Sequence, residues 1–391
     1  MDHRFEHNVA WTSDHPLGLA IERAEGPWLY LRDGGRIIDL ISGIAVSSLG
    51  HRHPAVIEAI RGQIDRHLHV MVYGEFIQEA QSALAARLAS HLPPSLSTVY
   101  FTMTGTEANE GALKLAKKHT GRTRLVAFEG SYHGDTHGSL SVTGRSVYRD
   151  PFLPLLPNVL FLPFDDVAAL SAIDEKVAAV ITEPIQGEGG INVPSGDWVR
   201  ALRKRCTDAG ALLIFDEIQS GLGRTGTLFA FEQMDVVPDI LTSAKALGGG
   251  MPLGCFISSP QILSSLRRDP PLSHVTTFGG HPVSCAAADA ALRVLMEEAL
   301  PERAAQIETR VRAALDHPRV VEVRGRGAML GMQLESAQIT ERVVEACLES
   351  GVLLGWTLHS NSLVRIAPPL NIPWEVMDQA LSVIRAKLDA S

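Results

Sequence analysis

The stretch LLIFDEIQSG, residues 212–221, places an acid directly after an uninterrupted apolar run. Such a run predicts a strand that is buried on both faces of a sheet. Similar runs occur in VAAVITEPI (177–185) and ILTSAKAL (240–247), and DWVRALRKRCTDAG (197–210) has helical spacing of its apolar residues. Buried strands that alternate with helices indicate an α/β fold, with a mostly parallel central sheet and helices on both faces.

The same alternation extends toward the N-terminus. STVYFTMT (97–104) and RLVAFEG (124–130) are predicted strands, and EANEGALKLAKKHTG (107–121) between them is a predicted helix that Gly121 closes. Two further helices are predicted at 54–68 and 76–92. Residues 1–35 are polar and irregular, which predicts an arm that packs on another part of the protein.

The pattern changes near residue 283. Two predicted helices precede a pair of antiparallel strands at 320–335, and two later helices flank a strand in SLVRIAP (362–368). This order is typical of a smaller α+β domain. We therefore expect three parts: an N-terminal arm with a small-domain segment at 1–50, a large ligand-binding domain at 51–282, and a C-terminal small domain at 283–391.

The composition argues against several classes of function. The 391 residues carry a formal net charge of −9 and no basic block, so neither nucleic acid nor an anionic membrane surface is the expected partner. No apolar run is long enough to span a membrane, and the first residues lack the apolar core of a signal peptide. Four cysteines without CxxC spacing are expected to be buried, reduced thiols, so we expect a cytoplasmic protein.

Three clusters of polar residues follow predicted strands, at the edge where ligands of open α/β sheets bind. In TGTEANE (104–110), Gly105 permits close approach of a ligand, and Thr106 adds a hydroxyl to the free N–H groups of a helix start. This combination suits a phosphate. An ordinary helix with a capping box formed by Thr104 and Glu107 is the alternative.

The other two clusters contribute a carboxylate and an amine. Asp216 ends a buried strand, where a carboxylate is costly unless a cation or strong donor meets it; a structural ion pair or a metal ligand would also fit. Lys245 follows another apolar strand, and an amine in a dry pocket can add to carbonyls, whereas a lysine that reaches solvent would have no such role. A phosphate-binding turn, an acid for a ring nitrogen and a carbonyl-binding lysine are together what pyridoxal phosphate needs.

With these residues the chain resembles the class-III aminotransferases, a fold-type-I pyridoxal-phosphate family that includes ornithine, acetylornithine and ω-amino-acid aminotransferases. The resemblance runs from SGIAVSSLGHRHP (42–54) to LVRIAPPLNI (363–372). Its motifs occur in the order TGTEANE, YHG, ITEPIQGEGG, IFDEIQSGLGRTG, SAKALGGGMPLG and TTFGGHP. The resemblance implies an enzyme that moves an amino group between an amine, ω-amino or diamino compound and a keto acid.

The resemblance also implies roles for individual residues of the large domain, which would hold the cofactor. Lys245 would bind pyridoxal phosphate covalently and later move a proton, and Asp216 would keep the pyridine nitrogen protonated. Gln219 would bond the phenolic oxygen of the ring. Tyr132 would stack on the ring face, with His133 beside it.

Three more residues would contact the phosphate. Gly105 and Thr106 would bind it from the same chain. Thr277, in TTFGGHP, would reach the phosphate of the neighbouring subunit. That last role requires a homodimer with two shared active sites.

Two competing motif interpretations lack the right context. GLGRTG (221–226) matches a dinucleotide-binding fingerprint, but it does not open directly from the strand and no helical pattern follows it. His133 and His137 have the spacing of metal ligands on a helix, but Gly134 and Gly138 disfavour a helix there and no fourth ligand is evident. We therefore expect no metal.

Two positions match the substrate-binding residues of ornithine-type members. Arg365 corresponds to an arginine that clamps a substrate α-carboxylate, and Glu188 corresponds to the glutamate that covers this arginine when an ω-amine is bound. Their presence implies glutamate and 2-oxoglutarate as one substrate pair. A structural ion pair is the alternative interpretation.

The turn SYHGDTHG (131–138) departs from that pattern. Ornithine- and acetylornithine-type enzymes carry arginine where this chain has Asp135. Like charges 4 Å apart repel by about 4 kcal/mol at an effective dielectric of 20, so a substrate carboxylate is disfavoured and a cation or hydroxyl is favoured. Diaminopelargonate aminotransferases have a similar turn, but they carry aromatic residues in place of Ile44 and Ala45 and lack a counterpart of Glu188.

The resulting hypothesis is transamination of a diamine or diamino acid. Alternatively, Asp135 only bonds N–H groups of its own turn. Two other functions stay open: a racemase or epimerase on the same scaffold, and a diaminopelargonate-type aminotransferase. A non-catalytic scaffold is disfavoured by the presence of both Lys245 and Asp216. Consumption of 2-oxoglutarate with formation of glutamate would distinguish a transaminase from a racemase.

Overall fold

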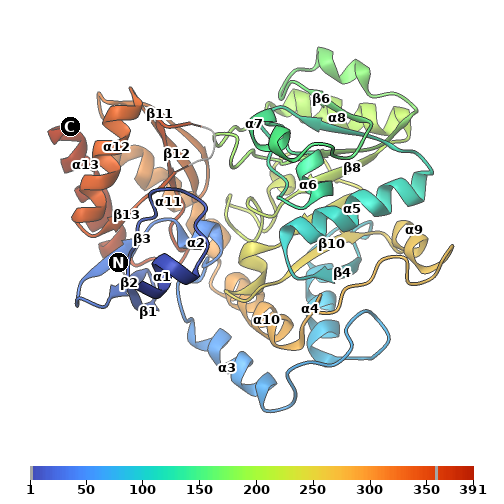
Figure 1. Ribbon diagram of the computed structural model, residues 1–391, viewed down its shortest axis with the longest axis horizontal. Coiled ribbons are helices and arrows are strands. Elements are labelled where there is room, and N and C mark those ends of the chain that lie inside the picture. Colours follow the sequence, from blue (N-terminus) through green and yellow to red (C-terminus); the bar gives the residue numbers. More distant parts are fainter. Residues whose placement is uncertain (1–2, 357–359) are drawn as a thin grey trace.

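The computed structural model describes residues 3–356 and 360–391. Figure 1 shows the large sheet and its helices on one side and two smaller sheets with the C-terminal helices on the other. The first strands of the chain lie beside its last helices (Figure 1). One direct contact is the parallel pairing of β3 (Arg36–Asp39) with β13 (Val352–Leu353), which lies in the sequence between the last two helices. Within the described residues, no helix has the length and apolar character needed to cross a bilayer.

The central sheet has seven strands in the order β4-β10-β9-β8-β7-β5-β6. β10 is antiparallel to both of its neighbours, and the other neighbouring pairs are parallel. This confirms the predicted mostly parallel sheet. The strands are β4 (Thr98–Thr102), β5 (Arg124–Phe128), β6 (Val159–Leu162), β7 (Val177–Thr182), β8 (Leu212–Asp216), β9 (Ile240–Ser243) and β10 (Gly254–Ser258).

Both faces of this sheet are covered. Along β5, Leu125 and Ala127 belong to one buried cluster, which includes residues of α5, and Val126 and Phe128 belong to another. Alternate side chains of a strand point to opposite faces, so the two clusters lie on the two sides of the sheet. The longer helices of this part are α3 (Pro54–Ile64), α4 (Glu79–Ser90), α5 (Gly105–Thr120), α8 (Gly196–Ala209) and α10 (Pro282–Glu297), which packs against α3 and α4.

Short helices connect these elements. They are α6 (His137–Ser141), α7 (Ser146–Arg149) and α9 (Pro260–Leu263), with 3-10 turns η1 (Asp150–Phe152), η2 (Ala168–Ala172), η3 (Ala230–Gln233), η4 (Lys245–Gly248) and η5 (Ser264–Arg267). The predicted stop of the helix after β4 is confirmed, because Gly121 caps α5 with a left-handed φ of 69°.

Two four-stranded sheets form the other side of the molecule. One has the order β1-β2-β3-β13, with β1 (Ile21–Glu25) and β2 (Trp28–Leu31). The second has the order β11-β12-β15-β14, with β11 (Val320–Arg326), β12 (Met329–Leu334), β14 (Gly355–Trp356) and β15 (Leu363–Ile366). The remaining helices are α1 (His3–Asn8), α2 (Ser42–Ala45), α11 (Leu300–Ala314), α12 (Ala337–Glu349) and α13 (Trp374–Ala390).

The prediction of an irregular arm over residues 1–35 is wrong for its second half. Within residues 21–31, β1 and β2 pair with each other, and β2 also pairs with β3. Gly26 and Gly34 make the connecting turns with φ values of 53° and 89°. Each strand is only four or five residues long, too short for a clear alternation in the sequence. The four cysteines are all buried and free.

Candidate active site

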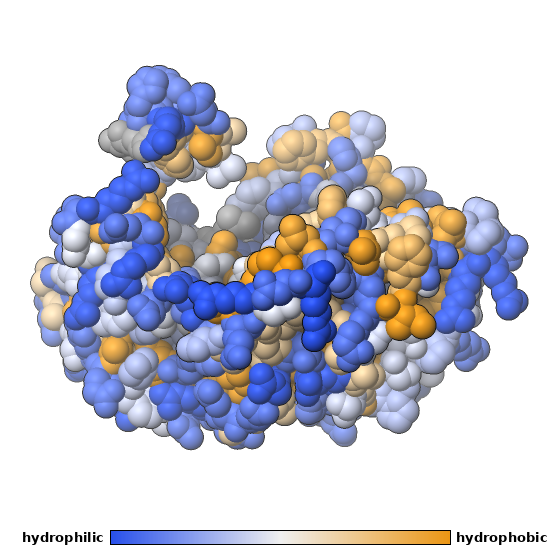
Figure 2. Space-filling model, turned by 90° about the horizontal axis from the view of Figure 1, so that it is seen from below, coloured by the Kyte–Doolittle hydropathy of each residue, from blue (hydrophilic) through white to orange (hydrophobic). Residues whose placement is uncertain are grey.

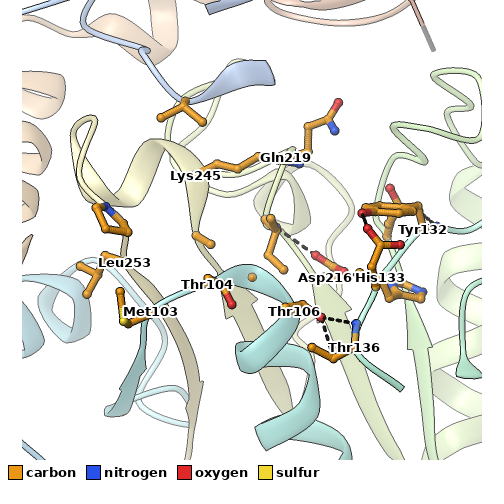
Figure 3. A pocket seen from close by; sticks show the side chains of 18 of the residues that line it. Met103, Thr104, Thr106, Tyr132, His133, Thr136, Asp216, Gln219, Lys245 and Leu253 are labelled. Atoms are coloured by element: carbon orange, nitrogen blue, oxygen red, sulfur yellow. Dashed lines mark hydrogen bonds and ion pairs between the residues drawn. The ribbon is translucent and has the colours of Figure 1, made fainter. Parts of the chain in front are cut away.

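A cavity of about 730 Å³ opens where β4, β8 and β9 end (Figure 3). The structure brings most of the sequence-predicted site residues to its wall. Those that line it are Gly105, Thr106, Tyr132, His133, Asp135, Asp216, Gln219 and Lys245. The cavity therefore lies at the carboxyl edge of the parallel strands, where the sequence predicts the site.

Asp216 ends β8 and is nearly buried, with 4% of its surface exposed. Its Oδ2 lies 2.8 Å from His133 Nδ1 and accepts a 2.8 Å hydrogen bond from Asn109 Nδ2, and its Oδ1 accepts a bond from the N–H of Ile218. Figure 3 shows His133 beside this carboxylate. Three donors can thus meet the charge, which satisfies the requirement for a buried carboxylate.

Asn109 is a site residue that the sequence analysis missed. Its amide nitrogen also donates to the His133 carbonyl at 2.8 Å, and its carbonyl oxygen accepts a 2.8 Å bond from the Thr242 hydroxyl. It therefore fixes both Asp216 and His133 relative to α5. Asparagine is a poor helix former, so a buried one among the alanines and leucines of α5 could have drawn attention to this position.

The start of α5 has the predicted cap. Thr104 Oγ1 accepts a 3.2 Å bond from the N–H of Glu107, and the Glu107 carboxylate accepts one of 2.8 Å from the N–H of Met103, one residue before the usual partner. A Cβ at Gly105 would come within 2.8 Å of the Ile218 side chain, so a larger residue there would require that side chain to move. The first N–H groups of a helix have no partner within it, which leaves them available to an anion.

The turn at 131–138 packs directly on this helix start. Thr106 Oγ1 lies 2.7 Å from the Thr136 hydroxyl, and Gly134 has a φ of 122° where a Cβ would clash with Thr106. Glu110 accepts hydrogen bonds from the N–H and O–H groups of Gly138 and Thr136 at 2.8 and 2.5 Å. The turn is therefore held in place by α5.

The expectation that glycines prevent a helix here is wrong for Gly138, which lies inside α6. The Glu110 carboxylate caps the N–H groups at the start of this short helix, and this offsets the low helix propensity of glycine. His133 precedes α6 and its ring contacts Asp216, while His137 is exposed at the start of the helix. The two histidines therefore do not share a helix face.

Tyr132 and Asp135 interact directly. The Tyr132 hydroxyl donates a 2.7 Å hydrogen bond to Asp135 Oδ2, a contact that the sequence did not predict. Burial and this bond raise the pKa of Tyr132. The phenol therefore stays neutral and remains a donor.

Glu183 is a second residue that the sequence analysis missed. Its carboxyl is buried and accepts bonds from the N–H groups of Tyr132 and Gly187 at 3.0 and 2.8 Å. Burial raises the pKa of Glu183 to about 7, and His133 opposes that rise. Glu183 thus holds the backbone of Tyr132, and the ITEPIQGEGG motif contributes more to the site than Glu188.

Lys245 follows β9 with a left-handed φ of 50° and lies beside Gln219 on the cavity wall. Burial lowers the pKa of Lys245; Glu188 opposes this shift and Arg365 adds to it. A lowered pKa increases the fraction of neutral amine, the form that adds to a carbonyl.

Glu188 and Arg365 lie just behind this wall. Arg365 belongs to β15, is 3% exposed, and donates from Nη2 to Glu188 Oε1 at 2.5 Å. Gln219 Nε2 donates to the same oxygen at 3.3 Å. The Arg365–Glu188 ion pair is therefore formed, and Gln219 connects it to the cavity wall. Thr277, by contrast, is exposed in the bend before α10 and is not among the described residues that line the cavity.

The residues present fit pyridoxal 5′-phosphate. Within the described residues, the buried atoms His133 Nε2 and Gln219 Oε1 have no hydrogen-bond partner. Buried polar atoms are normally satisfied, so both are available to a bound group. Together with the helix start at Gly105, the Asp216 carboxylate and the Lys245 amine, they match a phosphate, a pyridine ring and an aldehyde.

Comparison with known proteins agrees with this geometry. A family model described as aminotransferase class-III matches residues 9–388. The acetylornithine aminotransferases of Methanopyrus kandleri and Methanosarcina mazei are 42% and 41% identical over 371 residues, which cover 94% of this chain and 93% and 91% of those proteins.

Solved structures are also similar. An ornithine aminotransferase from Toxoplasma gondii has a TM-score of 0.91 at 31% identity, over 99% of this chain and 92% of that one. An (S)-enantioselective ω-transaminase from Thermomicrobium roseum has a TM-score of 0.90 at 30% identity, over 99% and 97%. The resemblance inferred from the motifs is confirmed: the chain belongs to the class-III aminotransferases, enzymes that use pyridoxal phosphate.

Proposed function

We propose that the protein transfers an amino group from a diamine or diamino acid to 2-oxoglutarate, forming glutamate. The family establishes the aminotransferase chemistry. The observation that carries the substrate proposal is the carboxylate of Asp135 on the cavity wall. A fixed negative charge there favours a substrate with a second cationic group.

The cofactor, when bound, supplies an aldehyde and an electron-withdrawing ring. In this proposal Lys245 would hold the cofactor covalently. Once the incoming substrate amine had displaced it, the free Lys245 amine would take and return the proton of the substrate carbon. Asp216 holds a proton on the pyridine nitrogen, and Asn109 and His133 keep its Oδ2 oriented. Gln219, through its unpaired Oε1, meets the ring hydroxyl.

The remaining cofactor contacts are proposed at the ring face and the phosphate. Tyr132 covers the ring, and its position is fixed at the backbone by Glu183. Gly105 and Thr106 bind the phosphate with the N–H groups and hydroxyl of the α5 start. These contacts would hold the cofactor in a fixed orientation within the cavity.

Arg365 and Glu188 allow one cavity to accept two kinds of substrate. The guanidinium of Arg365 has the planar fork that binds a carboxylate in bidentate fashion. Glutamate would take this fork when Glu188 turns away. An amine without a carboxylate would leave the 2.5 Å pair in place, so that Glu188 neutralises the arginine.

Asp135 separates this chain from the pattern of its acetylornithine-type relatives. The acetylornithine-type pattern that the motifs resemble has an arginine at the corresponding position, which would suit a distal carboxylate. Here the Tyr132 hydroxyl bonds Oδ2 of a carboxylate, and such a group has about four acceptor sites, so acceptor capacity remains for a substrate ammonium. We therefore do not propose the substrate of these relatives as the substrate of this protein.

We also propose a cytoplasmic homodimer in which Thr277 completes the partner's phosphate site. Figure 2 views the lower edge of Figure 1, and orange side chains gather in patches on this face. His69 and Phe278 are in ring contact at 4.9 Å, which places the loop before α4 beside the loop before α10. Exposed apolar residues of these loops are Leu68, Phe76, Ile77, Val275 and Phe278. Exposed apolar clusters of this kind mark interfaces.

The proposal is tested with a panel of amino donors. Cofactor-loaded protein is mixed separately with glutamate, ornithine, a linear diamine, a diamino acid and a monoamine of equal length, and the absorbance of the cofactor is followed. We expect glutamate and the diamino compounds to convert the cofactor, with the diamine at least tenfold faster than the monoamine. Equal rates for the diamine and the monoamine would show that Asp135 does not select a substrate with a second cationic group.

A further inference from the structure

The arginine of GLGRTG (221–226) has no role in the site described above. Arg224 is one of the largest fully buried side chains, with 1% of its surface exposed. It follows Gln219 by five residues in the loop after β8. A buried arginine at this place requires an explanation, because burying a charge is costly.

Within the described residues, the side-chain hydrogen bonds of Arg224 go to neutral oxygens from distant segments. Nη1 donates to the carbonyls of Pro368 and Ala328 at 2.5 and 3.3 Å, and Nη2 donates to the Ser48 hydroxyl at 2.9 Å. Its own carbonyl accepts a 2.8 Å bond from the N–H of Ala328. The side chain therefore joins the large-sheet side of the molecule to three segments of the other side.

The charge of Arg224 is retained at a cost. Burial lowers the pKa of the guanidinium to about 10, and the carboxylate of Asp39 opposes that shift. A group with this pKa is still protonated at neutral pH. A buried charge is weak evidence for stability, so the benefit of Arg224 lies in the positions that its guanidinium fixes.

The fixed segments carry the substrate-recognition residues. Pro368 follows Arg365 by three residues, and Ser48 follows the cavity residue Val46 by two. The N–H of Leu370 also donates to the Ser48 carbonyl at 2.7 Å. Arg224 is thus bonded on both sides of the contact between 46–48 and 365–370.

A strained turn lies in the same contact. Ser42, Gly43, Ile44 and Ala45 have successive φ values of 49°, 59°, 65° and 58°. Left-handed conformations are unfavourable for residues other than glycine, and they persist only where the surroundings fix them. Here the Ser42 hydroxyl donates to the Ala367 carbonyl at 2.8 Å.

We propose that Arg224 is a positioning residue for Arg365, and that it sets the distance between the guanidinium of Arg365 and the cavity wall at Gln219. Arg224 touches neither substrate nor cofactor in this account. It acts by fixing segment 365–370 and the turn at 42–48 against the loop that follows β8. Loss of the Arg224 guanidinium therefore weakens recognition of carboxylate-bearing substrates and leaves other amines unaffected.

The test uses the cofactor-loaded enzyme with Arg224→Met and Arg224→Lys. Hydrogen–deuterium exchange is measured for the amides of 363–370 and 40–48. KM and kcat are measured for glutamate and for a diamine in the half-reaction, which is followed by cofactor absorbance without any keto acid. For Arg224→Met we expect exchange in both segments to be at least tenfold faster, and the glutamate KM to rise at least tenfold with kcat within threefold. Diamine kinetics should stay within threefold. Arg224→Lys should be intermediate, because one ammonium cannot span Ser48 and Pro368.

Two further variants keep the test decisive. Ser48→Ala removes only the hydroxyl that Nη2 bonds, so it serves if Arg224→Met does not fold, with the glutamate KM expected to rise about threefold. Arg122→Met is the matched control: Arg122 also donates to backbone carbonyls, of Val177, Ala209 and Gly210, at the opposite edge of the sheet. It should lower the thermal midpoint without a selective change in the glutamate KM.

The outcomes separate this inference from the proposed function, on which its kinetic part rests. Parallel losses for glutamate and diamine, or exchange that rises throughout the chain or not at all, would overturn the role of Arg224. If the wild-type enzyme does not react with glutamate, the proposed substrate pair fails. Exchange in 363–370 and 40–48 then decides the inference alone.

Discussion

The phenol of Tyr132 and the carboxylate of Asp135 are joined by a hydrogen bond of 2.7 Å. Tyr132 is the residue proposed to cover the cofactor ring, and Asp135 is the residue proposed to bind the distal group of the substrate. Their bond means that a substrate cation at Asp135 also acts on the position of Tyr132. Substrate recognition and cofactor orientation are therefore linked through one contact.

Asp135→Asn should separate charge from hydrogen bonding. The amide oxygen can still accept from Tyr132, but the negative charge is lost. We expect kcat/KM for a diamine to fall at least tenfold, about 1.4 kcal/mol, with less than a threefold change for a monoamine. Tyr132→Phe is the control, because it removes the bond and keeps the charge, so the preference for the diamine should survive. Equal losses for both amines in Asp135→Asn would contradict the proposal.

Asn109→Asp should disturb Asp216 without changing volume. The new carboxylate would replace the amide N–H that now donates to Asp216 Oδ2 at 2.8 Å, and it would place a like charge beside it. We expect cofactor affinity to fall at least tenfold, measured by titration of the cofactor-free protein. Asn371→Ala is the comparison, since its amide bonds only the Leu49 carbonyl in the described contacts. Unchanged affinity in Asn109→Asp would show that Asp216 does not depend on Asn109.

Glu217 should make stability depend on pH. Its buried carboxyl accepts bonds from the N–H groups of Ala230 and Phe231 and from the Ser220 hydroxyl, and burial raises the pKa of Glu217 from 4.5 to about 7. The folded protein then binds this proton more tightly than the unfolded chain. The stabilising contribution is full below pH 4.5 and is lost as pH rises through about 7.

Glu217→Gln removes this proton linkage. The shift corresponds to about 3 kcal/mol at 1.36 kcal/mol per pKa unit. Between pH 5 and 7.5 the thermal midpoint of the variant should therefore decrease less with pH than that of the wild type, whatever its absolute value. Glu58→Gln, exposed on α3, is the control and should keep the wild-type slope. Parallel curves for Glu217→Gln and wild type would show that Glu217 is ionised throughout.

The sequence predicts the site better where residues end strands than where they form side-chain contacts. Asp216 and Lys245 each follow an apolar run, and the carboxyl ends of parallel strands meet at one edge, so their convergence could be foreseen. The strand order could not, because β4 and β10 pair across more than 150 residues of sequence. Nor could β10 be identified, since it is short and begins only four residues after the glycine-rich turn at 248–250.

The contacts of Asn109, Glu183 and Arg224 could not be predicted from the sequence for a related reason. Each bonds residues from segments far apart in the sequence, and no local pattern encodes those partners. What the sequence does contain is a local conflict: a polar or charged residue among apolar or small ones. Such conflicts are expected at functional positions.

The most direct measurement is the reaction of the cofactor-loaded enzyme with glutamate alone in D₂O. The account predicts one equivalent of 2-oxoglutarate per active site, with conversion of the cofactor to its amine form, and restoration of the original spectrum when 2-oxoglutarate is added in excess. The contradictory result is loss of the optical rotation of the recovered glutamate, with deuterium at its α-carbon and without any 2-oxoglutarate. That outcome would make the protein a racemase on this scaffold.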